Sequence, residues 1–354
     1  MTKGLDDWLG QWAPARQAGS RVEHIERPAS GWSSDTLLTT VGPAIDVDVD
    51  GDGDGDSQPV VELVVRVAPA PAVASFPADD FDLQAAVMRA LKTAGLPVPT
   101  VLAVENDPGW LGTPFLVMTR APGRTLGDAP ALDPRLAVLP SATQRRIHED
   151  YLDALATIHR LDWRAAGLEA TLRTAGPNLD AELDWWSTYV DWASGGDPAP
   201  ALVAHLQWCI DTAPAVAQDP SLCWGDARLG NVLFLDDGSI GALLDWELAS
   251  IGAPEMDLGW YLALDRLTTK VIGQPVPGFL GRDETISRYQ HHLGRPVEHL
   301  DWHEIFALVR SVAINERQAR LAAADGVPYP GVAGKDNPML TYITRRINRF
   351  EAAA

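Results

Sequence analysis

The 354-residue sequence contains only two cysteines, Cys209 and Cys223. Two cysteines are too few for a disulfide framework or a cysteine-rich zinc cluster, which favours a reducing, cytoplasmic setting. The sequence also has no uncharged stretch long enough to cross a bilayer, and no apolar signal core follows Met1. We therefore expect a cytoplasmic protein without a membrane partner.

Positive charge is scarce as well. The 28 Lys and Arg residues are outnumbered by 48 Asp and Glu residues, which gives a formal net charge of −20. Such an acidic chain repels a phosphate backbone, so nucleic acid is not an expected partner. In contrast, apolar residues make up 46% of the chain and 13 residues are Trp, a balance typical of a folded domain or two lobes.

Six of the acids form one run with Gly, residues 46–56. Its Asp-x-Asp-x-Asp-Gly spacing is similar to the start of a calcium-binding EF-hand loop. The twelfth loop position is Ser57, where that loop needs a Glu, and no helix pattern follows. The run therefore favours a solvated loop that joins two strands.

The predicted secondary structure changes from mainly strand to mainly helix about one third of the way along the chain. A short amphipathic helix around Trp8 is followed by strand patterns within 30–41, 60–67, 100–104 and 115–118 and a helix over 81–94. Beyond residue 123 the patterns are helical, over about 144–161, 180–193, 201–212, 284–293, 302–323 and 338–350. We therefore predict an α+β chain with a small β-rich N-terminal lobe (1–118), a hinge (119–123) and a larger helical C-terminal lobe (124–354).

Three polar residues recur at an informative spacing. Asp226 precedes Asn231 by five positions, and Asp245 ends a second strand-like run beyond the turn at 236–238. In kinases an Asp accepts the substrate hydroxyl proton, an Asn five positions later holds Mg²⁺, and an Asp beyond a hairpin joins the metal to the phosphates. Each residue alone could simply cap a turn or a helix. All three in this order favour the kinase interpretation.

The surrounding residues carry a family resemblance. Trp224-Gly225-Asp226 through Asn231, followed by Leu244-Asp245-Trp246-Glu247, resembles the signature of the aminoglycoside phosphotransferase and choline kinase-like superfamily. Pro122-Gly123-Arg124 and Asp257-Leu258-Gly259-Trp260 fall in the family's order. The resemblance implies a bilobal protein-kinase-like fold, ATP and Mg²⁺ as cofactors, and phosphoryl transfer to a hydroxyl of a small molecule. The His-Arg-Asp, Asp-Phe-Gly and Ala-Pro-Glu motifs of protein kinases are missing.

The resemblance also assigns roles to individual residues. It implies that Asp226 is the catalytic base and that Asn231 and Asp245 are the metal ligands. It further implies a nucleotide-binding set in the N-terminal lobe, in which a glycine loop covers the phosphates and backbone groups just past Met118 bind the adenine edge. This set consists of Ser30, Gly31, Ser33, Ser34, Arg66, Met118, Thr119 and Ala121.

The sequence departs from the family pattern at three positions. The His that usually precedes Gly-Asp is Trp224, and the strand Lys that grips the phosphates is replaced by Arg66, which can contact phosphate through two N–H groups. Gln84 stands where a helix Glu is expected as the partner of that cation, and Asp80 or Asp82 could take its place.

Two further residues are candidate substrate contacts. Arg228 lies within the catalytic segment and could contact phosphate or substrate, or support the loop by a salt bridge. Glu247 follows the metal Asp and could face substrate or metal, or be structural. We expect a kinase acting on an aminoglycoside-like or another hydroxylated metabolite. The alternative is a nucleotide-binding regulatory module that has lost turnover, which Gln84 and Trp224 motivate.

Overall fold

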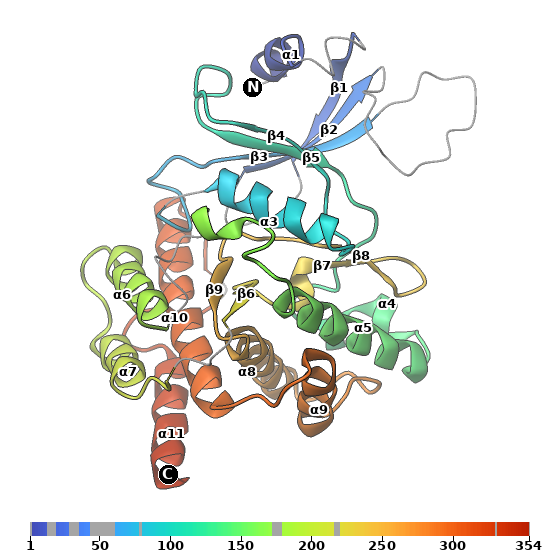
Figure 1. Ribbon diagram of the computed structural model, residues 1–354. Helices are drawn as coiled ribbons and strands as arrows, with labels where there is room; N and C mark the ends of the chain where they lie inside the picture. The colour runs from blue at the N-terminus through green and yellow to red at the C-terminus, as the bar shows by residue number, and fades with distance from the viewer. Residues whose placement is uncertain are drawn as a thin grey trace. The chain divides into compact units, whose positions relative to one another are not determined.

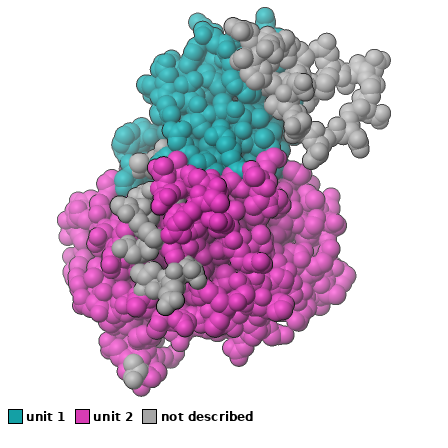
Figure 2. Space-filling view, viewed as in Figure 1, with its two compact units in different colours: residues 1–89, 99–121 teal, residues 90–98, 122–354 magenta. Residues whose placement is uncertain are grey.

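The computed structural model describes residues 2–12, 19–27, 35–42, 61–77, 80–171, 179–215, 220–329 and 331–353. The chain divides into two compact units (Figures 1 and 2), one of residues 1–89 and 99–121 and one of residues 90–98 and 122–354. The division after residue 121 falls inside the segment predicted as a hinge. Residues 90–98 belong to the second unit, where the Pro97 carbonyl accepts a hydrogen bond of 2.8 Å from the Leu243 N–H.

The first unit is built on a five-stranded antiparallel sheet in the order β1-β2-β3-β5-β4. Its elements are α1 (Thr2–Leu9), β1 (Arg21–Glu26), β2 (Asp35–Gly42), β3 (Val61–Val67), α3 (Phe81–Thr93), β4 (Val101–Glu105) and β5 (Phe115–Thr119). Alternate residues of β3, from Val61 to Val67, are buried against α1, as the period of two in a strand requires. The predicted β-rich lobe and its entry helix are confirmed.

The sequence analysis did not identify β1. The strand pairs with β2, but its six residues are exposed or only half-buried. Only Val22 and Ile25 of this edge strand pack against the core, and their spacing of three lacks the strict alternation of apolar and polar residues that would reveal a strand.

The second unit is mainly helical, as predicted. Its helices are α4 (Pro134–Ala137), α5 (Ser141–His159), α6 (Leu179–Ser194), α7 (Pro200–Asp211), α8 (Glu255–Ile272), α9 (Arg282–Leu293), α10 (Leu300–Ala324) and α11 (Pro338–Ala353), with the single turns η1 (Pro130–Leu132), η2 (Leu168–Ala170) and η3 (Leu229–Asn231). Two short antiparallel pairs complete it, β6 (Ser221–Cys223) with β9 (Ser250–Gly252) and β7 (Val232–Phe234) with β8 (Ile240–Leu243). Within the described ranges, no helix combines the length and the apolar character that a membrane span needs.

Helix α8 was also missed by the sequence analysis. All nine residues from Glu255 to Ala263 are buried, so the helix shows no amphipathic period. It packs closely on α10 at Gly259, where an added Cβ would lie 2.9 Å from the His303 backbone carbon. This close approach brings the first turns of α8 and α10 together.

A buried histidine of α5 is held in its neutral form. His148 is 1% exposed, and its Nδ1 accepts a hydrogen bond of 3.0 Å from the Leu280 N–H. The proton must therefore reside on Nε2, which donates to the Tyr261 hydroxyl at 2.7 Å. Burial, with a smaller contribution from Arg145, lowers the pKa of His148 to about 3.

We expect the stability of the protein to fall with pH below 6.5. Burial likewise lowers the pKa of His303 to about 4. Between pH 6.5 and pH 4 the unfolded chain therefore binds protons at His148 and His303, whereas the folded chain leaves both neutral, so folding becomes less favourable as the pH falls. From an unfolded-state pKa of 6.5, each histidine contributes about 2 kcal/mol, or roughly 4 kcal/mol for the pair, between pH 7.5 and pH 5. Urea unfolding at pH 7.5 and pH 5 measures the difference. A His148→Gln variant should lose about half of this pH dependence, and an unchanged slope would exclude the assignment.

Candidate active site

The loop between β6 and β7 carries the predicted base. It turns at Gly225, whose φ of +88° lies in the left-handed region. A Cβ at this position would lie 2.2 Å from the Leu248 carbonyl oxygen, so the backbone path requires glycine on two counts. The turn directs the next residue, Asp226, away from the strand pair β6–β9.

The carboxylate of Asp226 is fixed by three donors. Its Oδ1 accepts from the Trp260 indole N–H at 2.9 Å, and its Oδ2 accepts from Asn231 Nδ2 at 2.8 Å and from Arg228 Nε at 2.9 Å. The side chain keeps 15% of its exposure. An ionised carboxylate offers about four acceptor positions. The remaining position is on Oδ1, which is therefore the atom able to take a proton.

The β7–β8 hairpin brings the two predicted metal ligands to one end. Val232 pairs with Leu243, and the Leu244 N–H donates to the Asn231 carbonyl at 2.9 Å. Asn231 therefore lies opposite the residue before Asp245. Both hydrogen bonds from the Asn231 side chain, to the Asp226 carbonyl and to its carboxylate, come from Nδ2. The amide is thus oriented with Oδ1 available, and an amide oxygen beside a carboxylate is the kind of ligand pair that Mg²⁺ prefers.

Asp245 has an unusual backbone that two tryptophans support. Its φ is +66°, which is uncommon for a residue with a side chain. The Trp224 indole N–H donates to the carbonyls of Leu244 and Asp245 at 2.8 and 3.2 Å, and its ring stacks on Trp246 with centroids 5.0 Å apart. The Trp that replaces the family's usual His thus connects the base loop to the Asp245 segment.

A buried carboxylate on α8 anchors the catalytic loop. Asp257 is 0% exposed and accepts from the backbone N–H groups of Trp224 and Gly225 at 2.6 and 2.9 Å. Its Oδ2 also accepts from His159 Nε2 at 2.9 Å, and His159 Nδ1 lies 2.5 Å from the Tyr289 hydroxyl. His159 is therefore a structural histidine that supports this anchor.

The two candidate substrate contacts have different surroundings. Arg228 forms ion pairs with Asp226 and Asp128, which is the loop-supporting alternative. Burial opposes its charge, but these carboxylates outweigh that effect and raise the pKa of Arg228. Glu247 is half-buried, and its charge acts together with the dominant effect of burial to raise the pKa of Tyr189 on α6. Contacts of Arg228 and Glu247 with a substrate stay predictions.

In the first unit, Arg66, the cation predicted to contact the phosphates, lies beside Gln84, the residue at the position where the family has a Glu. Arg66 on β3 is 8% exposed, so it is not a solvent-facing charge, and its Nη1 donates to Gln84 Oε1 of α3 at 3.2 Å. The suggested substitutes for Gln84 have other roles. Asp80 accepts from the Leu83 N–H at the start of α3, and Asp82 accepts from Asn106. The cation is thus paired with an amide and not with Asp80 or Asp82.

Of the remaining nucleotide-binding candidates, the structure describes only those at the end of β5 and just after it. Ser30, Gly31, Ser33 and Ser34 lie outside the described residues, as does the acidic run at 46–56. Met118 and Thr119 end β5 and are buried. The Thr119 N–H donates to the Thr100 carbonyl at 2.9 Å, so this N–H does not supply the predicted adenine contact. A contact from Ala121 stays a prediction.

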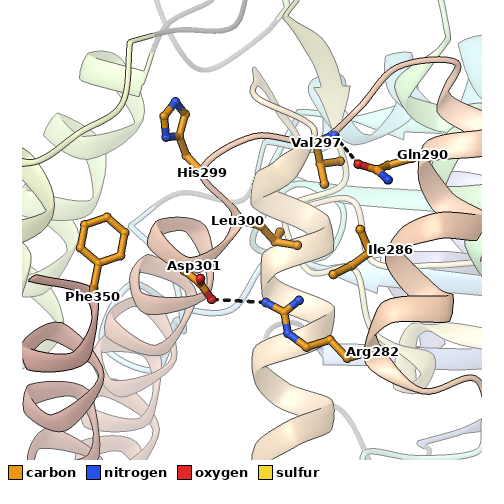
Figure 3. Close-up of a pocket in the computed structure, with 8 residues that line it drawn as sticks. All are labelled: Arg282, Ile286, Gln290, Val297, His299, Leu300, Asp301 and Phe350. Carbon is orange, nitrogen blue, oxygen red and sulfur yellow. Dashed lines mark hydrogen bonds and ion pairs between the residues drawn. The ribbon is translucent and has the colours of Figure 1, made fainter. Parts of the chain in front are cut away.

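A cavity of about 350 Å³ lies elsewhere in the second unit, among α9, α10 and α11 (Figure 3). Its charged residues are already paired, since Arg282 contacts both Asp301 and Glu304. None of the residues that line it belongs to the loop 224–231 or to the segment after β8. We therefore do not assign the acceptor to this cavity.

Sequence reasoning gave no role to three residues that contact the catalytic loop. Asp257 and Trp260 were seen only as part of the resemblance, although their i, i+3 spacing on one helix face was a usable signal. Arg310 on α10 donates to the Gly225 carbonyl at 2.6 Å. It lies 85 residues further along the chain from Gly225, and no local pattern marks it.

Comparison with known proteins identifies the family. Residues 24–292 match the sequence model of the Phosphotransferase enzyme family. The chain is 31% identical over 175 residues to acyl-CoA dehydrogenase family member 10 of Mus musculus, covering 49% of this chain and 16% of that protein. It is 30% identical over 187 residues to acyl-CoA dehydrogenase family member 11 of Homo sapiens, covering 52% and 23%. The chain thus matches less than a quarter of the length of these two curated relatives.

Solved structures share the fold. A Ralstonia eutropha protein assigned to the aminoglycoside phosphotransferases superposes with a TM-score of 0.67 at 20% identity, over 99% of this chain and 98% of that one. A type I macrolide 2′-phosphotransferase gives a TM-score of 0.55 at 17% identity, over 95% of each chain. The chain therefore has the α+β fold of these phosphotransferases and belongs to the Phosphotransferase enzyme family.

Proposed function

We propose that the protein transfers the γ-phosphoryl group of a Mg²⁺-bound nucleoside triphosphate to a hydroxyl group of a small molecule. The single observation that carries this proposal is the Asp226 carboxylate, fixed by three donors with one acceptor position left on Oδ1. Asn231 and Asp245, at one end of the β7–β8 hairpin, complete the set of residue types that phosphoryl transfer uses.

Each residue has a defined task in this reaction. Asp226 accepts the proton of the acceptor hydroxyl at Oδ1 while the hydroxyl oxygen bonds to the γ-phosphorus and the nucleoside diphosphate leaves. Asn231 and Asp245 are the residues that would hold Mg²⁺, which neutralises charge on the phosphate oxygens when bound. Arg66 contributes a guanidinium that can contact phosphate oxygens through two N–H groups.

The nucleotide and the acceptor can be identified by a panel. One structural neighbour was solved with GDP and kanamycin, so both ATP and GTP are tested as donors and aminoglycosides as one acceptor class. Amino alcohols and sugars form two further classes. The curated relatives are named as acyl-CoA dehydrogenase family members, which adds hydroxyacyl compounds. Magnesium-dependent phosphorylation of one class supports the proposal, whereas nucleotide binding without any turnover would favour the regulatory module.

Arg66→Ala should weaken the affinity for the nucleoside triphosphate by roughly tenfold or more, because a charge-assisted hydrogen bond to phosphate contributes about 1.5–3 kcal/mol. Calorimetry with Mg·ATP or Mg·GTP measures the affinity. The matched control is Arg120→Ala in the same unit, which removes a guanidinium that forms an exposed ion pair with Glu62. Equal affinities of the Arg66 and Arg120 variants would show that Arg66 does not contact the phosphates.

A further inference from the structure

The catalytic loop rests on a buried cation that the proposed mechanism does not use. Arg310 of α10 is 1% exposed and donates a hydrogen bond of 2.6 Å from Nη2 to the Gly225 carbonyl. Its Nε and Nη1 have no hydrogen-bond partner among the described residues. Burial lowers the pKa of Arg310, so the structure opposes the charge that this residue carries.

The guanidinium lies against aromatic rings, one of which contacts the proposed base. Its central carbon is 4.7 Å from the ring centroid of Trp186 and 4.7 Å from that of Trp260. The Trp260 indole N–H in turn donates to Asp226 Oδ1. Arg310 therefore contacts the loop on both sides of Asp226, through the carbonyl of the preceding residue and through the indole that orients the carboxylate.

The buried guanidinium of Arg310 is not explained by a gain in folding stability. The desolvation cost of this buried ion is offset only in part by one hydrogen bond, by cation–π contacts and by the charges of Glu182, Asp257 and Asp226, because the net effect still lowers the pKa of Arg310. Removing one member of a buried charged network lowers stability when its partners are left uncompensated. A loss of stability alone therefore does not assign a role to Arg310, and the test compares turnover of the folded protein with its stability.

We propose that Arg310 is a positioning residue for the phosphoryl-transfer reaction. It holds the Trp260 ring and the Gly225 carbonyl so that the Trp260 N–H keeps Asp226 Oδ1 directed at the acceptor hydroxyl. The consequence for turnover rests on the proposed role of Asp226 as the base, whereas the Arg310–Trp260–Asp226 contacts can be tested by themselves.

The first experiment follows the Trp260 indole N–H by NMR in protein labelled with ¹⁵N-tryptophan. A Trp260→Phe variant assigns the resonance by its loss. Arg310→Met should move this resonance toward the position of a weaker hydrogen bond, and so should Asp226→Asn, which changes the acceptor. Arg346→Met is the matched control, because Arg346 is a buried arginine that pairs with Glu304 instead of the loop. A resonance unmoved in the Arg310 variant would overturn the proposal.

The second experiment measures kcat, KM and thermal unfolding with the best acceptor of the panel. Arg310→Met should lower kcat roughly 10- to 100-fold, since a displacement of about 1 Å can cost a hundredfold, with KM little changed when the folded protein is assayed well below its unfolding temperature. Trp260→Phe should have a similar effect, and the double variant should be no worse than the single ones, because both remove the same support. Arg310→Lys, which keeps a cation over the ring, should recover part of kcat.

The outcomes separate the possible failures. Wild-type kcat in Arg310→Met, effects of the two variants that multiply, or a loss of kcat that merely follows a loss of stability as in Arg346→Met would each overturn the positioning role. If Arg310→Met does not fold, Trp260→Phe and Arg310→Lys decide the question with the same NMR and kinetic measurements. If the indole resonance moves in Arg310→Met but Asp226→Asn retains full turnover, the base assignment is wrong while the contacts between Arg310 and the loop stand.

Discussion

Turnover by the Asp226→Asn variant is expected to fall by roughly 10²- to 10⁴-fold, which is the usual contribution of a positioned general base. The amide keeps the shape of the carboxylate but cannot take the hydroxyl proton. Its NH₂ group would also face a donor, because both Asp226 oxygens accept hydrogen bonds, Oδ1 from Trp260 and Oδ2 from Asn231 and Arg228. Affinity for the Mg·nucleotide should change little, since Asp226 is not one of the two proposed metal ligands. Steady-state kinetics and calorimetry measure the two effects separately.

Asp245→Asn provides the matched comparison. This variant removes a charged metal ligand, so it should lower both turnover and the Mg²⁺-dependent affinity for nucleotide. Nucleotide binding measured without Mg²⁺ should be similar in wild type and in both variants. Wild-type turnover in Asp226→Asn would exclude the base assignment, and unchanged Mg²⁺ dependence in Asp245→Asn would exclude the metal assignment.

The geometry around the candidate catalytic residues is local. Asp226, Asn231 and Asp245 lie on a loop, a tight turn and two short strands within 20 residues, and the structure places the Asn231 carbonyl 2.9 Å from the Leu244 N–H. The α+β fold was predictable because strand patterns prevail before residue 119 and helical patterns prevail after residue 123. Such signals depend on neighbouring residues, which is the information that a sequence displays directly.

The supports of the hairpin were not predictable, because they come from distant helices. Asp257, Trp260 and Arg310 act on the loop from α8 and α10, and residues 255–263 of α8 are buried on all sides, which hides the helix itself. The family pattern placed Gln84 where a Glu partner of Arg66 is expected and left Asp80 or Asp82 as substitutes, and the structure shows a hydrogen bond from Arg66 to Gln84. Long-range packing decided each of these cases.

Asp257→Ala should lower the free energy of unfolding by about 3–5 kcal/mol, the range found when one partner of a buried charged network is removed. The substitution leaves the backbone N–H groups of Trp224 and Gly225 and the His159 Nε2 proton without their acceptor, in a site that is 0% exposed. Urea unfolding measures the loss. Asp184→Ala, which removes an exposed carboxylate from α6, should change the unfolding free energy by less than about 0.5 kcal/mol. Because Asp257 fixes the two residues that precede the base, turnover of the folded fraction should also fall at least tenfold at low temperature. A variant as stable and active as the Asp184 control would show that α8 does not anchor the loop.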